Sequence, residues 1–255
     1  MSTRTVAQAL SRLGVPRDGV LFVHSAFRGL AREGFTAESV IEELANHVGN
    51  GTLLMPTMSW RYVKPQNPEF SELDTPSNTG IMTEVFRTKR ATARSLHPTH
   101  SVAGMGPDAA KLLGEHHLDE TPCSPRSPFG KLVSADAWIL MLGIGFDCCT
   151  LIHHGEELVA PQLYLRPPEQ AETYACCDRH GRVHTVRLRR HVFLPRDYWQ
   201  FQDQLAIDSR LRINFIGNVV CRAFRAKDLH SRVIRTLQAR PDAILPKPGQ
   251  RYRRM

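Results

Sequence analysis

Three short runs of apolar residues limit what this chain can fold into more than any other feature of its sequence. They lie at residues 19–24, 52–55 and 137–143. In each run, odd and even positions are both apolar, which is typical of strands buried on both faces of a sheet. Helical patterns separate the runs. The sequence therefore predicts an α/β protein: a single α/β/α sandwich with a central mixed sheet covered by helices on both faces.

The remaining elements follow from local patterns. We expect helices at residues 3–13, 36–48 and 81–89, another that begins near Thr150, and a C-terminal helix at 211–227. Residues 61–77 are rich in Pro, Asn and Ser and have no period, which predicts an ordered surface loop. No low-complexity linker divides the chain, so we expect residues 1–255 to form one domain.

The apolar runs also bear on the compartment of the protein. The most apolar stretch, Trp138 to Phe146, has about nine residues, whereas a helix needs about 20 to cross a bilayer. The first residues lead into no signal-peptide core. We therefore expect a cytoplasmic protein that has no membrane partner.

The positive charge of the chain is confined to its last third. The whole sequence has 33 Lys and Arg against 25 Asp and Glu, a net charge of +8. Residues 1–160 have 14 against 17, whereas residues 161–255 have 19 against 8. In this basic subregion, residues 183–189 alternate apolar and basic side chains after Gly181, which predicts a half-exposed strand that follows a hairpin turn.

A basic region with aromatic neighbours raises the question of nucleic-acid binding. Tyr198, Trp199 and Phe201 could stack on bases, and the surrounding arginines could contact phosphates. No recognised binding motif accompanies them, however, so we expect no nucleic-acid partner.

The six cysteines do not form a recognised framework. They lie at positions 123, 148, 149, 176, 177 and 221, so four of them are in two adjacent pairs. Adjacent cysteines suit neither a disulfide framework nor the spacing of zinc sites. We interpret them as buried or idle thiols, with a metal site built from the two pairs as the alternative.

Two polar segments are candidates for a binding site. His24 to Arg28 follows the first apolar run and offers a hydroxyl, backbone amides and a guanidinium that could bind an anion, although a plain turn would have the same residues. Ser95 to Ser101 places two imidazoles and two hydroxyls around Pro98, in what is either a functional loop or an ordinary surface loop.

The strongest chemical signal follows the third apolar run. If a helix begins near Thr150, His153 and Glu156 are three residues apart and lie on one face, so the carboxylate can orient the imidazole. This is the arrangement of a general base with its acid partner. His154 and Glu157 have the same spacing, so spacing alone does not choose between the pairs. A structural pair or a metal site remain alternatives, although no HExxH motif is present.

Taken together, these segments resemble the aminoglycoside 3-N-acetyltransferase family. The matching segments are 22–27, 51–57, 75–80, 95–102, 127–132 and 143–156. They occur in the family's order, and the resemblance spans roughly residues 5–230. It implies the antibiotic N-acetyltransferase fold, which is distinct from the GNAT acetyltransferases, and a role in antibiotic resistance. The implied partners are acetyl-CoA and a small amine acceptor, with the protein a monomer or a homodimer and no metal required.

The resemblance also implies roles for individual residues. His153 would deprotonate the substrate amine, Glu156 would be its carboxylate partner, and Asp147 would belong to the same catalytic group. The segments that resemble the lining of the CoA cleft contain His24, Ser25, Phe27, Met55, Pro56, Thr57 and Ser101, with His97 and Ser127 as further candidates.

The charge pattern leaves the acceptor open. Aminoglycosides are polycations, and acidic residues should bind them. His97 and the acidic residues Glu69, Glu72, Asp74 and Asp178 are candidates for that role. The basic stretch 179–191 instead favours an anionic amine, such as a nucleotide-linked amino sugar or an amino-phosphonate. Alternatively, it faces solvent or contacts the CoA phosphates.

Overall fold

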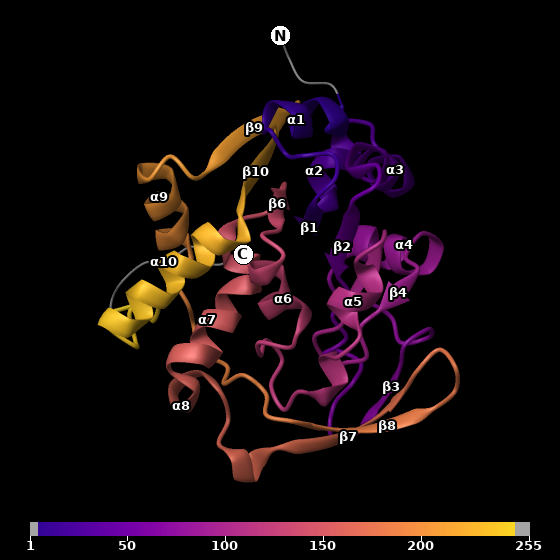
Figure 1. The fold of residues 1–255 in the computed structure, drawn as a ribbon, viewed down its shortest axis with the longest axis vertical. Coiled ribbons are helices and arrows are strands. Elements are labelled where there is room, and N and C mark those ends of the chain that lie inside the picture. The colour runs from indigo at the N-terminus through magenta and orange to yellow at the C-terminus, as the bar shows by residue number, and fades with distance from the viewer. Residues whose placement is uncertain (1–4, 248–255) are drawn as a thin grey trace.

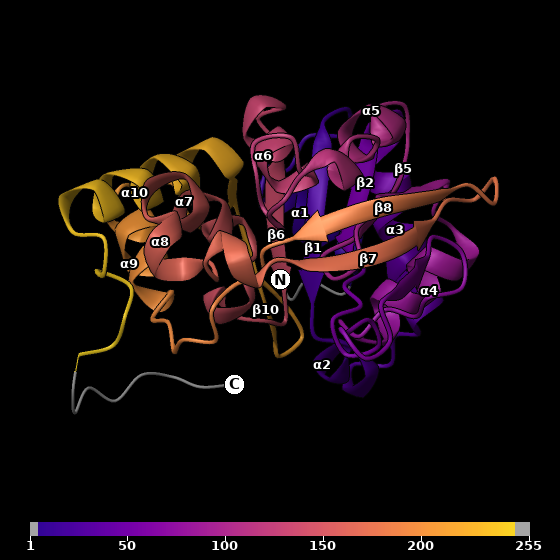
Figure 2. The same cartoon turned by 90° about the horizontal axis from the view of Figure 1, so that it is seen from below.

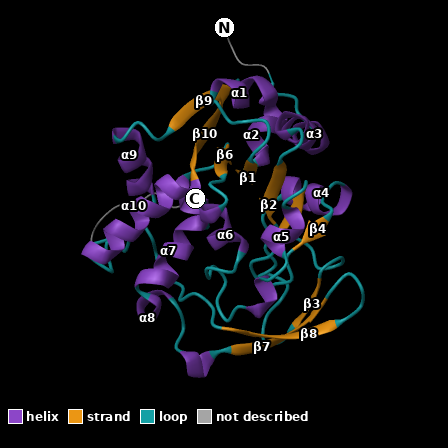
Figure 3. Cartoon of the chain, viewed as in Figure 1, coloured by secondary structure: helices purple, strands orange, loops and turns teal. Residues whose placement is uncertain are grey.

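The computed structural model describes residues 5–247, and a seven-stranded mixed sheet lies at its centre (Figures 1 and 3). Across the sheet the strands are β4 (Ala93–Arg94), β5 (Val102–Met105), β2 (Thr52–Pro56), β1 (Val20–Ser25), β6 (Trp138–Leu142), β10 (Val219–Arg225) and β9 (Arg212–Ile216). The β1 strand pairs in parallel with β2 and β6, and the outer strands pair antiparallel. The three predicted apolar runs are therefore the three central parallel strands.

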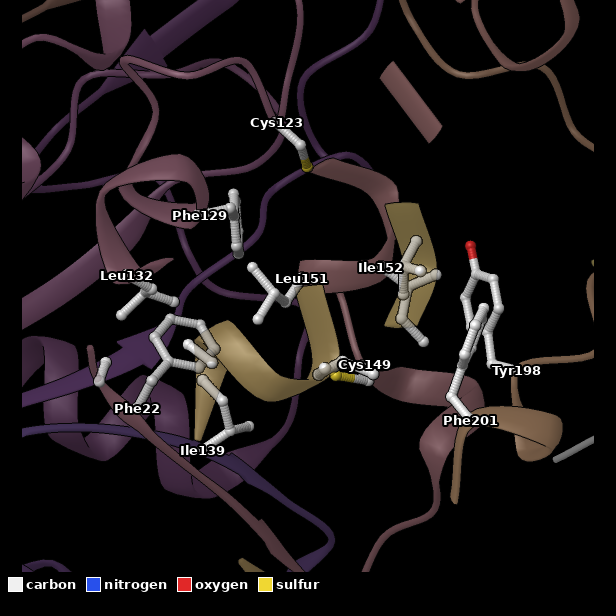
Figure 4. Packing of buried hydrophobic residues seen from close by; sticks show 14 of the residues in the cluster. Phe22, Cys123, Phe129, Leu132, Ile139, Cys149, Leu151, Ile152, Tyr198 and Phe201 are labelled. Atoms are coloured by element: carbon white, nitrogen blue, oxygen red, sulfur yellow. The ribbon is translucent and has the colours of Figure 1, made fainter. Parts of the chain in front are cut away.

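Both faces of this sheet are buried, as predicted. In β1, Val20 and Phe22 pack into one apolar cluster, whereas Leu21 and Val23 pack into the other. The first cluster, part of which Figure 4 shows, also contains residues of α5 (Ala109–Leu113), α6 (Pro128–Ser134), α7 (Leu151–Val159), α9 (Trp199–Ile207) and α10 (Ala226–Ala239). The second contains residues of α1 (Val6–Arg12), α2 (Phe27–Arg32), α3 (Ala37–Val48) and α4 (Ile81–Lys89).

Local signals set several helix boundaries as expected. The α3 helix begins after Thr36, whose side chain and that of Ser39 form a reciprocal capping box, and it ends at Gly49, which has φ +54°. Thr150 is the N-cap of α7. The first expected helix is α1, which starts at Val6; residues 3 and 4 of that prediction lie outside the described range.

A second, three-stranded sheet crosses one end of the molecule (Figure 2). It contains β3 (Glu69–Ser71), β7 (Glu172–Cys177) and β8 (Val183–Leu188). The hairpin turn before β8 is confirmed, and Gly181 within it has φ +79°. The expectation of a loop at 61–77 was wrong in part, because β3 pairs with β7 through residues that are distant in sequence. A small core of Val63, Phe70, Leu96, Tyr174, Cys176, Val186 and Leu188 supports this sheet.

The helix predicted at 211–227 is wrong. Residues 212–216 and 219–225 are the strands β9 and β10, and the helix α10 begins only at Ala226. Ile216 pairs with Val219, so Gly217 and Asn218 form a two-residue hairpin loop, and Gly217 has φ +54°. Pairing of β10 with β6 buries alternate residues such as Cys221 and Ala223, and this tertiary contact overrides the local helical pattern.

Two further predictions concern cysteines and the membrane. No disulfide joins any of the six cysteines, and the two adjacent pairs do not come together as a metal-binding group within the described range. No helix of residues 5–247 has both the length and the hydropathy needed to cross a bilayer.

Candidate active site

The α7 helix brings His153 and Glu156 into direct contact, as their spacing predicts. The imidazole Nδ1 lies 2.8 Å from Glu156 Oε2. The Glu156 side chain is fully buried, whereas 20% of the His153 side chain remains exposed. One end of this pair is therefore enclosed in protein, and the other is accessible to a substrate.

Two residues from the segment before α9 complete the surroundings of Glu156. The Tyr198 hydroxyl donates to Glu156 Oε1 over 2.6 Å, and Arg196 Nε donates to the same oxygen over 2.8 Å. Burial alone would raise the pKa of Glu156, but the charges of His153 and Arg196 and the hydrogen bond from His153 lower it to about 2. Glu156 is therefore a carboxylate at any physiological pH.

This arrangement selects one tautomer of the candidate base. Because Glu156 is an ionised acceptor, His153 Nδ1 carries a proton and donates it in the hydrogen bond. The Nε2 atom is then the basic nitrogen. A buried carboxylate behind the ring stabilises the imidazolium that forms when Nε2 takes a proton, so the pair can act as a general base.

The second pair with the same spacing does not form. His154 Nδ1 donates instead to the carbonyl of Cys123 over 2.6 Å, and its ring stacks on His230. Glu157 accepts from the backbone amide of Cys123 at 2.9 Å and from His191 Nε2 at 2.8 Å. Burial raises the pKa of Glu157 to about 7, although neighbouring donors oppose the shift. Tertiary contacts thus distinguish two pairs that spacing alone could not.

His191 joins the site from the end of the basic stretch. Its ring stacks on that of His153, with 4.3 Å between centroids and 21° between planes. A bridge between Leu165 and His191 holds this segment beside α7. Burial lowers the pKa of His191, and the charge of His153 lowers it further, so His191 is a neutral neighbour of the base.

The arginines of the basic stretch are mostly paired with acids. The pairs are Arg179 with Glu72, Arg182 with Asp178, Arg187 with Glu120 and Arg190 with Glu172. Four of the five arginines at 179–191 therefore have a carboxylate partner in the fold, and two of these partners, Glu72 and Glu120, come from the first 160 residues. His191 is the residue of this stretch that touches the candidate base.

The residues expected in the CoA cleft gather at one edge of the sheet but differ in accessibility. Parallel pairing brings together the carboxyl ends of β1 and β2, where His24, Ser25, Met55, Pro56 and Thr57 lie. His24 is buried, its Nε2 has no hydrogen-bond partner among residues 5–247, and burial lowers its pKa to about 3. Ser25 is half-buried, whereas Met55 and Pro56 are buried.

Other expected cleft residues have structural contacts. Thr57 and Ser101 are buried and hydrogen-bonded to each other, and both bond to the guanidinium of Arg94. Phe27 packs against the second apolar cluster. Ser127 is the N-cap of α6 and accepts from the amide of Gly130.

His97 is fully buried. Its Nδ1 accepts from the amides of Thr99 and His100, and its ring stacks on His116 at 4.1 Å. In this conformation it has no surface that a substrate could contact.

The acidic residues expected to bind a polyamine are mostly distant from α7. Glu69 is on β3, and Asp74 follows it and accepts from Ser71. Asp178 accepts from the amides of the hairpin turn, at the end of β7 far from α7 (Figures 1 and 2). Asp147 is closer in sequence to α7, in the 3₁₀ turn Phe146–Cys148. Its Oδ1 has no hydrogen-bond partner in the part of the chain that the structure describes, and burial raises its pKa.

Sequence reasoning did not assign three contributors to this site. Arg196, Tyr198 and His191 contact the His153–Glu156 pair, and all three lie at least 35 residues further along the chain. None belongs to a motif with a fixed spacing from His153. Only the contact geometry identifies them.

Comparisons with known proteins identify the family of the chain. Residues 22–238 match the family model described as aminoglycoside 3-N-acetyltransferase. The chain is 29% identical to aminoglycoside N(3)-acetyltransferase IV of Salmonella sp over 260 residues, which cover 96% of this chain and 91% of that protein.

Solved structures have the same fold. One is a histidine-to-alanine mutant of aminoglycoside acetyltransferase AAC(3)-IVa in complex with a gentamicin, with TM-score 0.82 and 25% identity over 97% of this chain and 93% of that one. Another is AAC-IIIb with CoASH, with TM-score 0.78 and 22% identity over 94% and 98% of the two chains. The match to AAC-IIIb is evidence of a common fold.

Proposed function

The chain belongs to the aminoglycoside 3-N-acetyltransferase family and is therefore an acyltransferase, and from that premise we propose that it transfers the acetyl group of acetyl-CoA to an amino group of an aminoglycoside or a related amino sugar. The observation that carries the proposal is the hydrogen bond of 2.8 Å between His153 and a buried, ionised Glu156. This pair provides a base at a partly exposed position.

The proposed reaction needs a base because the acceptor is mostly an ammonium ion at neutral pH, and only the neutral amine attacks a thioester. The ammonium first loses one proton to solvent, which gives the neutral amine that attacks the thioester carbonyl. As the nitrogen–carbon bond forms and the carbon–sulfur bond breaks, His153 Nε2 takes the second proton from the nitrogen, while Glu156 accepts from Nδ1–H and stabilises the imidazolium. His153 then passes this proton to the CoA thiolate and is neutral again, so no protein nucleophile is needed.

Acetyl-CoA supplies the activated acyl group in this scheme. Two observations favour the edge of the sheet at the ends of β1 and β2 as its binding region. His24 presents a buried Nε2 without a partner there, and such an atom normally requires a hydrogen bond. Ser25 follows it with a half-buried side chain.

We propose a cationic acceptor over an anionic one. The case for an anionic amine depends on the basic stretch 179–191, and its arginines are largely paired with carboxylates. These carboxylates offset part of the positive charge of the stretch, so it is weaker evidence for an anionic substrate than the sequence alone suggests. A thiol-release assay with acetyl-CoA should therefore detect turnover with aminoglycosides, and turnover only with phosphate-bearing amino sugars would contradict this acceptor class.

Two neighbouring histidines allow a matched test of the base. In His153→Asn, the side-chain amide can still donate to Glu156, but no proton acceptor replaces Nε2. We expect acetyl transfer to fall by about 10²–10⁴-fold, with CoA binding by calorimetry close to wild type. In the control His154→Asn, the amide can still donate to the Cys123 carbonyl, and transfer should remain near wild type. Full activity of His153→Asn, or equal loss in both variants, would contradict the assignment.

A further inference from the structure

Three side chains that are far apart in sequence meet beside the candidate base. Cys123 lies in the loop before α6, Glu157 is on α7, and His191 follows β8. Their sulfur, oxygen and nitrogen donor atoms all lie within 4.8 Å of one another. We propose that these three residues form a binding site for a divalent transition-metal ion such as Zn²⁺.

The donor set suits this class of ion. Zinc binds thiolate sulfur at about 2.3 Å and imidazole nitrogen or carboxylate oxygen at about 2.0–2.2 Å, so the donors of a tetrahedral site are about 3.3–3.8 Å apart. Here no two donor atoms are more than 4.8 Å apart. The largest separation therefore exceeds the tetrahedral spacing by about 1.5 Å at most. Hard ions such as Mg²⁺ prefer oxygen alone, so a thiol and an imidazole together select a softer ion.

The surrounding structure already holds the carboxylate in place. Glu157 Oε1 accepts from the Cys123 amide at 2.9 Å and from His191 Nε2 at 2.8 Å, so one group bridges the other two residues. Glu157 Oε2 is buried, and no hydrogen bond of normal geometry reaches it in the described part of the chain. The Thr121 side chain is near enough to donate a hydrogen bond to the carboxylate, which lowers the pKa of Glu157. A buried carboxylate oxygen with so few donors is a natural ligand for a cation.

Burial makes the site selective and limits its access. The Cys123 side chain is fully buried, and only 3% of Glu157 and 11% of His191 are exposed. Figure 4 shows Cys123 at the border of the apolar cluster. The partly exposed region next to His153 is the side from which an ion can enter, because His191 lies directly against that ring.

An ion in this site would inhibit the enzyme. Three protein ligands leave a fourth coordination position open. His153, Glu156 and His191 form a second group whose donor atoms also lie within 4.8 Å of one another. The ion can therefore compete with the substrate for the imidazole of His153, or hold His191 in a position that blocks the acceptor. The inhibition depends on the proposed function, whereas the binding does not.

Cobalt spectroscopy tests the binding directly. The full chain is treated with EDTA, dialysed and titrated with Co²⁺ alone, because a thiolate ligand gives cobalt an intense charge-transfer band in the near ultraviolet. We expect this band, saturating near one equivalent, in the wild type and in the control Cys177→Ser, whose half-buried cysteine lies on β7. The band should be lost in Cys123→Ser, and addition of Zn²⁺ should abolish it in the wild type.

A second variant guards against a folding defect at the buried cysteine. Glu157→Gln keeps the size of the side chain and an acceptor for the Cys123 amide but removes the negative charge. We expect this variant to retain the wild-type circular dichroism spectrum. Its cobalt charge-transfer band should no longer saturate near one equivalent of Co²⁺. No band in the wild type, a band that persists in Cys123→Ser, or unchanged binding in Glu157→Gln would overturn the site. Zn²⁺ that binds without lowering acetyl transfer would overturn the inhibitory role alone.

Discussion

Two adjacent glutamates on α7 should affect stability with opposite dependence on pH. Glu156 lies among cationic donors, and its pKa is lowered from 4.5 to about 2. Burial is the largest influence on the pKa of Glu157 and raises it from 4.5 to about 7. Replacing each by glutamine, which keeps the shape and the acceptor oxygen, removes one titration at a time. The two variants are therefore matched controls for each other.

The magnitudes follow from the shifts. Since one pKa unit corresponds to about 1.4 kcal/mol, ionised Glu156 contributes about 3.5 kcal/mol to the free energy of unfolding at pH 7. This contribution falls to about 1.5 kcal/mol at pH 3. Below pH 4.5 the carboxyl group binds a proton in the unfolded state but not in the folded state, so a falling pH favours unfolding. The sign is reversed for Glu157, whose raised pKa costs about 1 kcal/mol at pH 5 and about 3 kcal/mol at pH 8.

Urea unfolding followed by circular dichroism measures these differences. Compared with wild type, Glu156→Gln should be destabilised more at pH 7 than at pH 3, by about 2 kcal/mol. An additional cost that does not vary with pH arises because Arg196, only 10% exposed, loses its carboxylate. Glu157→Gln should gain about 2 kcal/mol relative to wild type between pH 5 and pH 8.

The comparison has a clear failing outcome. If the two variants change in parallel with pH, or if neither difference varies with pH, the opposite environments inferred for the two carboxylates are wrong. Activity gives a second measurement, since Glu156→Gln should lower kcat by on the order of 10²-fold or more through loss of the charge that stabilises the imidazolium. Wild-type kcat in that variant would refute the pairing of Glu156 with the base.

Two other substitutions test the packing around this pair. Tyr198→Phe removes the hydroxyl that donates to Glu156 over 2.6 Å, and we expect the free energy of unfolding to fall by about 1.5–3 kcal/mol in urea titrations, as for other hydrogen bonds to charged groups; an unchanged value would argue against that bond. In Gly155→Ala, the new Cβ would lie 2.3 Å from Val233 Cγ1 of α10, so the melting temperature should drop, with a cost of about 1–3 kcal/mol. Adding Val233→Ala should recover part of that loss, and no recovery would show that the contact is not its cause.

Local patterns were sufficient for the centre of the fold. Residues 20–23 are apolar at every position, so a strand there has to be covered on both faces, and the structure divides them between two clusters. The capping box of α3 likewise acts within a few residues of itself. The spacing that places His153 and Glu156 on one face of α7 is equally local, because one helical turn separates them.

Local patterns failed where distant segments decide the outcome. Residues 219–225 form a strand because β6 offers a free edge for pairing, and nothing within that stretch shows that such an edge exists. Residues 69–71 pair with β7, which lies about one hundred residues further along the chain. In both places the free energy of pairing outweighs a weak local preference.

The site itself divides in the same way. The sequence by itself predicted the helix and two His–Glu pairs of equal spacing on it, since both depend only on the periodicity of α7. Only the tertiary structure decided that His153 bonds to Glu156, whereas His154 bonds to the Cys123 carbonyl and Glu157 to His191. It also decided that the pKa of Glu156 is lowered and that of Glu157 is raised, because Arg196 and His191, which approach from another segment, add to the effect of His153 on Glu156. It also decided that the arginines of 179–191 are paired and that His191 lies against the base. Charge and spacing can be read from the sequence. A pKa depends on every group within a few ångströms, and the tertiary structure determines which groups those are.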